Sequence, residues 1–128
     1  MDAAQALADL TEISSQVEAA VLFDADGTVR GSTLAEPAAA ERLARAAAQL
    51  LDGAGARASG GASLTQLEAA TADGSVFVVR DGERRIAATT GPSPTVGLVF
   101  YDLKSCLRAA DVPAKRTRSR KKQTPDEA

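Results

Sequence analysis

Residues 19–33 read AAVLFDADGTVRGST, and this stretch decides how the first part of the chain folds. The apolar run from Ala20 to Phe23 is typical of a buried strand, and the run from Thr28 to Thr33 is typical of a second strand. Asp26-Gly27 lies between them, and this dipeptide tolerates the positive φ that tight hairpin turns need. The stretch therefore predicts a β-hairpin.

The same pattern returns in residues 60–91, which read GGASLTQLEAATADGSVFVVRDGERRIAATTG. Turn signals at Asp73-Gly74 and Asp81-Gly82 separate three extended runs, at 63–71, 75–80 and 84–90. Short turns join antiparallel neighbours, so these runs predict a three-stranded meander. We expect the run 63–71 to be an edge strand, whose unpaired backbone groups are available to a second chain.

Three further segments have the spacing of amphipathic helices. The first lies near 3–16, the second begins at Pro37 with a C-terminal stop at Gly53, and the third follows Ser93-Pro94, read as N-cap and first helical position. The apolar positions that define their faces are Leu7, Leu10, Ile13 and Val17; Ala40, Leu43, Ala44, Ala47, Leu50 and Leu51; and Val96, Val99, Leu103, Leu107 and Ala110. The order α-β-β-α-β-β-β-α predicts an α+β fold with a five-stranded, mainly antiparallel sheet flanked by three helices.

Composition limits the chemistry of the chain. Its 128 residues suit one domain, 45% are hydrophobic, and there is no His and a single Cys. The absence of His excludes Ser-His-Asp and Cys-His nucleophile pairs and zinc sites of the Cys/His kind. Cys106 lies on the apolar side of the third helix and is expected to be a core residue. No signal peptide or membrane-spanning run is recognisable, so a cytoplasmic location is expected.

A boundary at Pro113 divides the charge unevenly. Residues 113–128 hold six of the 15 Lys and Arg residues and two of the 17 Asp and Glu, a net charge of +4, which leaves −6 on residues 1–112. We expect 1–112 to be the folded domain and 113–128 to be a disordered tail, since it has no large apolar residue. Its cations could contact an acidic protein, membrane or nucleic-acid surface, or serve solubility alone. They are Lys115, Arg116, Arg118, Arg120, Lys121 and Lys122.

One short string suggests catalysis. VLFDADGTV fits the phosphatase signature of the haloacid-dehalogenase superfamily, in which Asp24 would be the phosphorylated nucleophile, Asp26 the general acid/base, and both would help hold Mg²⁺. That superfamily also needs a later Lys, a further acidic pair and a parallel sheet. Lys104 is the one Lys of residues 1–112, and no matching acidic pair follows. The alternative interpretation is a hairpin turn supported by Asp side chains.

Taken together, residues 5–110 resemble the roadblock / dynein light-chain family, in its bacterial form. The opening hairpin, the Ala/Leu-rich second helix, the meander of residues 60–91 and the closing TVGLVFYDLKSCLRAA, with its Gly97–Leu103 stretch, follow that family's order and spacing. The resemblance implies a roadblock/longin-like fold, with one helix on one face of the sheet and two on the other. The basic tail is outside the family pattern.

The resemblance also implies function. It predicts a non-catalytic protein without cofactor, metal or small-molecule substrate, which forms homodimers or heterodimers and acts with a small Ras-like GTPase as activator, co-regulator or scaffold. The alternative is a tethering dimer that acts through its tail without a GTPase. The second helix and the edge strand would make the dimer, through Ala39, Ala46, Leu64, Gln66 and Glu68. The GTPase would contact the polar residues of the second helix, namely Arg42, Arg45 and Gln49.

Overall fold

The computed structural model describes residues 2–57 and 64–111, and its elements follow the predicted order. They are α1 (Ala3–Ile13), β1 (Val17–Asp24), β2 (Val29–Ser32), α2 (Pro37–Gly55), β3 (Gln66–Ala70), β4 (Ser75–Asp81), β5 (Arg84–Thr90) and α3 (Val96–Asp111). The segment 113–128, expected to be a tail, lies outside the described residues. Within 2–57 and 64–111, no helix combines the length and the apolar character needed to cross a membrane.

The five strands form one sheet in the order β2-β1-β5-β4-β3, and every neighbouring pair is antiparallel. The α+β prediction is therefore confirmed, and so is the position of β3 at an edge. Strands β1 and β5 are distant in sequence, yet they lie side by side near the centre of the sheet, where Val21 pairs with Ala87. The second edge is the short strand β2.

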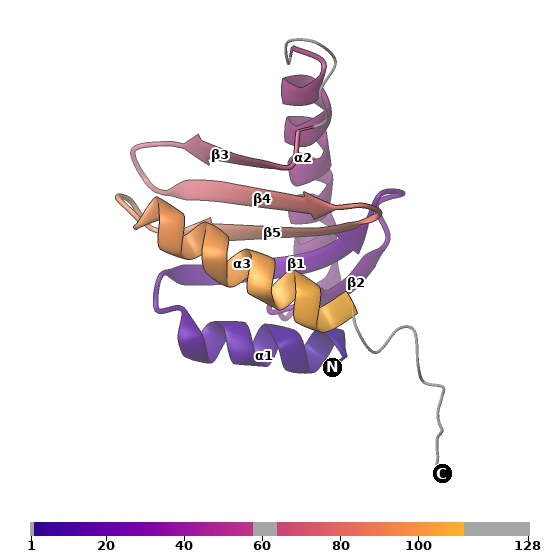
Figure 1. Ribbon diagram of the computed structural model, residues 1–128, viewed down its shortest axis with the longest axis vertical. Helices are drawn as coiled ribbons and strands as arrows, with labels where there is room; N and C mark the ends of the chain where they lie inside the picture. The colour runs from indigo at the N-terminus through magenta and orange to yellow at the C-terminus, as the bar shows by residue number, and fades with distance from the viewer. Residues whose placement is uncertain (1, 58–63, 112–128) are drawn as a thin grey trace.

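Helices cover both faces of the sheet, with α1 and α3 on one face and α2 on the other (Figure 1). Alternate residues of β1 point to opposite faces, as strand geometry requires. Ala20 and Leu22 join the core beneath α1 and α3, while Val21 and Phe23 join the core beneath α2. Few aromatic residues contribute: Phe77 and Phe100 pack edge-to-face with ring centroids 5.0 Å apart.

Several element boundaries differ from the sequence prediction. Helix α1 ends at Ile13, three residues early, because Ser14 adopts an extended conformation and leads into β1. Val17 was expected on the helix and instead pairs with Thr90 in the sheet. Helix α2 passes Gly53 and ends at Gly55. These ends depend on where the next element attaches, which helical periodicity does not report.

The predicted start of α3 is also wrong. Ser93 has φ 58°, a left-handed conformation that an N-cap does not adopt. The helix begins at Val96, two residues after the predicted first position Pro94. Its first turn is closed by the Val99 N–H, which donates to the Thr95 carbonyl at 3.0 Å. The Thr95 N–H in turn donates to Gln16 Oε1 at 2.6 Å. The residue before α3 is thus held by the segment before β1, a contact that helical periodicity does not report.

The Asp-Gly turns use glycine for two different reasons. Gly27 and Gly82 have φ of 90° and 62°, the left-handed conformations that hairpin turns require. Gly74 is different, because a Cβ there would collide with the Thr90 carbonyl oxygen of β5. Close approach of two backbones, rather than dihedral freedom, requires glycine at this position.

We expect Gly74→Ala to lower the free energy of unfolding by about 1–3 kcal/mol, because the added methyl group displaces the backbone of Thr90. Gly53→Ala is the matched control: its Cβ meets nothing within 4 Å, and Ala in a helix is favoured over Gly by roughly 0.5–1 kcal/mol. Urea unfolding of the two variants measures the difference. Equal midpoints would show that the sheet accommodates a side chain at residue 74.

Candidate functional site

The Asp-Ala-Asp-Gly-Thr string builds the turn between β1 and β2. The Gly27 N–H donates to the Asp24 carbonyl at 2.9 Å, and the Asp24 N–H donates to the Thr28 carbonyl at 2.9 Å. The Asp26 carboxylate accepts from the Thr28 N–H at 2.9 Å. This bond from the Thr28 backbone is the main reason that the pKa of Asp26 lies below its ordinary value. Both hydrogen bonding and φ thus support the hairpin interpretation.

Asp24 is engaged by Arg30 on the neighbouring strand. The guanidinium donates to Asp24 Oδ2 from Nε at 2.6 Å and from Nη2 at 2.5 Å. The same contact raises the pKa of Arg30 above its ordinary value. A phosphoryl-accepting Asp needs a free oxygen beside a metal and a parallel sheet, whereas this sheet is antiparallel. The fold of the haloacid-dehalogenase superfamily is therefore excluded, and the string forms a hairpin turn. In the described ranges, no three acidic or thiol side chains gather closely enough to hold a metal ion.

Helix α2 presents three different surfaces. Its buried face is made largely of small residues, which bring the helix close to the sheet: Ala40, Ala44, Ala47 and Leu51. Leu43 and Leu50 were expected on this face but are only half-buried. With Ala39 and Ala46 they follow i, i+4, i+7, i+11 spacing, so they form a second apolar stripe that we call the outer stripe. The spacing of these four residues is visible in the sequence, where the pattern places Leu43 and Leu50 on the buried face instead.

The third surface of α2 is polar. Arg42, Arg45 and Gln49, the predicted GTPase-contacting residues, are all exposed and share one side of the helix by their i, i+3, i+7 spacing. Arg45 also lines a hollow of about 640 Å³ between α2 and the β1–β2 turn. Glu41 and Asp26 line the same hollow. The predicted arginine surface and the Asp-Gly turn, which are well separated in the sequence, therefore border the same hollow.

The residues predicted for the dimer do not share one surface. Ala39 and Ala46 lie on the outer stripe of α2, and Leu64 packs against the core beneath α2. Gln66 and Glu68 pair with Val79 and Phe77, whose side chains belong to the opposite core. By the two-residue period of a strand, Gln66 and Glu68 face the α1/α3 side. Glu68 accepts a hydrogen bond from Ser75 Oγ at 3.1 Å.

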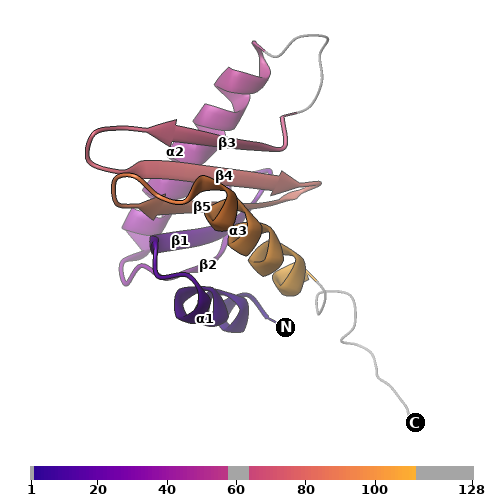
Figure 2. The ribbon, with the colours of Figure 1, turned by 60° about the vertical axis from the view of Figure 1, so that its left-hand side comes forward.

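The position of α2 relative to β3 is visible in two views (Figures 1 and 2). The helix crosses the strands, and its C-terminal turns extend beyond the β3 edge of the sheet. On the sheet face that α2 covers, Ala19, Val76 and Thr89 remain partly exposed. The edge strand β3 and the projecting end of α2 therefore lie at the same edge of the sheet, and part of the face that α2 covers is accessible.

Two large side chains on the face opposite α2 are exposed. Ile13, expected on the buried side of α1, is 71% exposed, and Tyr101 on α3 is 64% exposed. Cys106 is buried as predicted, and its thiol lies 3.4 Å from the Ala6 carbonyl oxygen. Burial is the main reason that the pKa of Cys106 rises to about 11.

Comparison with known proteins gives a consistent result. The sequence model described as the Roadblock/LC7 domain matches residues 3–90. A Roadblock/LC7 domain from Streptomyces avermitilis is similar in structure, with a TM-score of 0.75 and 20% identity, over 85% of this chain and 94% of that one. No curated protein matches this sequence significantly.

Two proteins named MglB are also similar in fold. The gliding protein MglB from Thermus thermophilus has a TM-score of 0.70 and 17% identity, over 84% of each chain. Myxococcus xanthus MglB has a TM-score of 0.66 and 16% identity, over 90% of this chain and 89% of that one. At these identities the likeness concerns the fold.

We expect Cys106 in the folded protein to react slowly with iodoacetamide near neutral pH and to accelerate only as the pH approaches about 11. Because folding favours the protonated thiol, its contribution to stability is present below the ordinary pKa of 9.0 and is lost as the pH rises toward about 11. The rate of alkylation against pH measures this. Protein unfolded in guanidinium chloride is the control, and fast reaction of the native protein at neutral pH would contradict the assignment.

Proposed function

The chain belongs to the Roadblock/LC7 domain family, and on that basis we propose that it is a homodimeric regulatory subunit that binds and modulates a small Ras-like GTPase. The family resemblance supplies the class of partner. The side of the molecule where α2 projects past β3 supplies the surface, and this arrangement is the observation that carries the proposal.

The proposed dimer forms through β3 and the outer stripe of α2. An edge strand has N–H and C=O groups that point away from its sheet, and a second copy of β3 satisfies them. The C-terminal turns of α2 then lie over the partner's sheet. Ala39 and Ala46 are small enough to let the two α2 helices approach closely, with Leu43 and Leu50 completing the apolar contact.

The register of β3 refines the residue assignment within this dimer. Leu67 pairs with Val78 and packs against the core beneath α2, so it lies on the same face as the outer stripe. Gln66 and Glu68 lie on the other face of β3. In the proposed dimer they flank the strand pairing, while Leu64 and Leu67 continue the apolar surface of α2.

The proposed GTPase surface is the polar side of α2 together with the hollow beside it. Arg42 and Arg45 are exposed cations with no ion-pair partner within the described residues, and Gln49 adds a hydrogen-bonding group. A GTPase loop that enters the hollow would meet Arg45, Glu41 and Asp26. Asp24 and Asp26 are occupied in holding the turn, so the proposed role is binding and positioning rather than catalysis by this chain.

We expect Ala46→Arg to shift the protein from dimer to monomer, because a long cation would be buried between two α2 helices. Ala46 is exposed in the single chain, so the variant keeps its fold. Analytical ultracentrifugation measures the shift, and circular dichroism confirms folding. Ala38→Arg, an exposed alanine of the same helix outside the outer stripe, is the matched control. A dimer that resists Ala46→Arg would place the interface elsewhere.

We expect the double substitution Arg42→Glu and Arg45→Glu to weaken GTPase binding at least about tenfold. The two arginines would face an acidic surface of the partner, and two glutamates in their place would repel it. Biolayer interferometry with purified Ras-like GTPases of the source organism, loaded with GTP or GDP, measures binding, and phosphate release measures hydrolysis. Arg57→Glu, an exposed arginine beyond the end of α2, is the control. Absence of binding by the unaltered protein in either nucleotide state favours the tethering alternative.

A further inference from the structure

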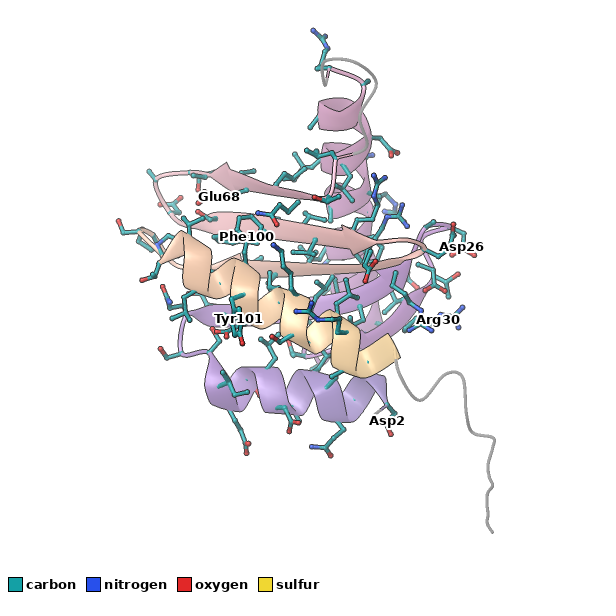
Figure 3. All side chains as sticks on the ribbon, viewed as in Figure 1. Asp2, Asp26, Arg30, Glu68, Phe100 and Tyr101 are labelled. Carbon is teal, nitrogen blue, oxygen red and sulfur yellow. The ribbon has the colours of Figure 1, made fainter. Side chains whose placement is uncertain are left out.

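A groove between α1 and α3 lies on the sheet face opposite α2, away from the proposed dimer and GTPase surfaces. It has a volume of about 310 Å³ and is walled by Leu10, Ile13 and Tyr101. Two carboxylates, Asp9 on α1 and Asp102 on α3, also line it. In Figure 3, Tyr101 leaves α3 on the side of α1.

Asp102 is a mostly buried acidic residue without a partner among the described residues, and its carboxylate oxygens still reach the surface of the groove. It is 7% exposed, and none of residues 2–57 or 64–111 gives it a hydrogen bond or an ion pair. Asp9 has one hydrogen bond, from Gln5 Nε2 of its own helix at 2.9 Å. A carboxylate at the surface of a groove that has no protein partner is available to a cation, and hydrogen bonds between two charged groups are the stronger ones.

The rest of the groove fits the other parts of a long cationic side chain. Leu10 and Ile13 offer apolar contact to the methylene groups of Lys or Arg, which bury their stems while the charged end finds a polar partner. The exposed ring of Tyr101 offers its face to a guanidinium. An acidic floor with apolar walls selects a basic side chain over a neutral or acidic one.

We propose that this groove binds the basic segment 115–122 of the same chain, with Arg116 or Arg118 at Asp102. Charge favours this occupant: residues 113–128 carry +4 and the rest of the chain −6. Position favours it as well, since the C-terminal end of α3 lies beside the N-terminus of α1 (Figure 1), and Ala6 and Ala109 line the groove on that side. A tethered segment also acts at a high effective concentration.

The chain length is sufficient for this contact. Asp102 lies nine residues before Asp111, the end of α3, which is about 14 Å along the helix. Arg116 lies five residues after Asp111 and can reach about 17 Å from it when extended. Arg118 reaches further. The bound segment covers the side chains of Ile13 and Tyr101. If an acidic surface of another molecule binds the segment instead, these two side chains become exposed.

Paramagnetic relaxation tests the contact in the full chain. A nitroxide on Ser119→Cys, in a Cys106→Ser background, should broaden the amide signals of Asp9, Ile13 and Tyr101 and leave those of α2 sharp. Asp102→Asn should restore the groove signals. Asp52→Asn, an exposed carboxylate on α2, is the matched control and should not. About 1 M salt, which screens charges beyond ~3 Å, should also restore them.

Replacement of the six tail cations by Gln keeps the described residues unchanged and should abolish the broadening. Uniform broadening over both faces, or none, would overturn the proposal. Broadening that appears only when a spin-labelled chain is mixed with an isotope-labelled chain that carries no nitroxide would assign the groove to the segment of another copy and overturn the same-chain occupant.

Discussion

Strands β1, β4 and β5 bury side chains on both of their faces, and the arrangement of the molecule follows from this. Their apolar residues alternate between two cores, one beneath α1 and α3 and one beneath α2. A sheet with two apolar faces needs cover on both. Two helices cover one face, whereas α2 alone crosses the other and passes beyond β3. The open edge strand and the projecting end of α2 therefore lie at the same edge of the sheet, where we place the interaction surfaces.

Alanine allows α2 to serve more than one role. Its buried face consists of Ala40, Ala44, Ala47 and Leu51, so the helix lies close to the sheet without long side chains. The outer stripe again combines small residues with leucine, and Arg42 and Arg45 project from the remaining side. Core, proposed dimer contact and proposed partner contact thus occupy three sides of one helix. A bulky core residue would hold α2 further from the sheet and open the hollow beside the β1–β2 turn.

Local signals predicted the elements well and their limits poorly. The Asp-Gly turns, the edge position of β3 and the burial of Cys106 followed from short-range patterns that the structure confirms. The start of α3 did not, and the Thr95–Gln16 contact that holds the residue before it joins segments 79 residues apart. Of the candidate site, Arg42, Arg45 and Gln49 are exposed and share one side of α2 by their spacing, while their contact with a GTPase stays a prediction. Gln66 and Glu68 were predicted to share a surface with α2, yet they face the α1/α3 side of the sheet. The face that a strand residue takes depends on its register with the partner strand, which the sequence does not report.

The sequence by itself determined the order of helices and strands, the antiparallel class and the hairpin turns, because each depends on residues close together in the chain. Only the tertiary structure decided which apolar residues on the predicted helix faces stay outside the cores. Ile13 and Leu50 have the same local pattern as Leu10 and Leu51, yet they lie outside the cores. Likewise, Asp102 is an ordinary helical carboxylate until α1 packs beside it. Burial is a property of two surfaces, and the second surface comes from a distant part of the chain.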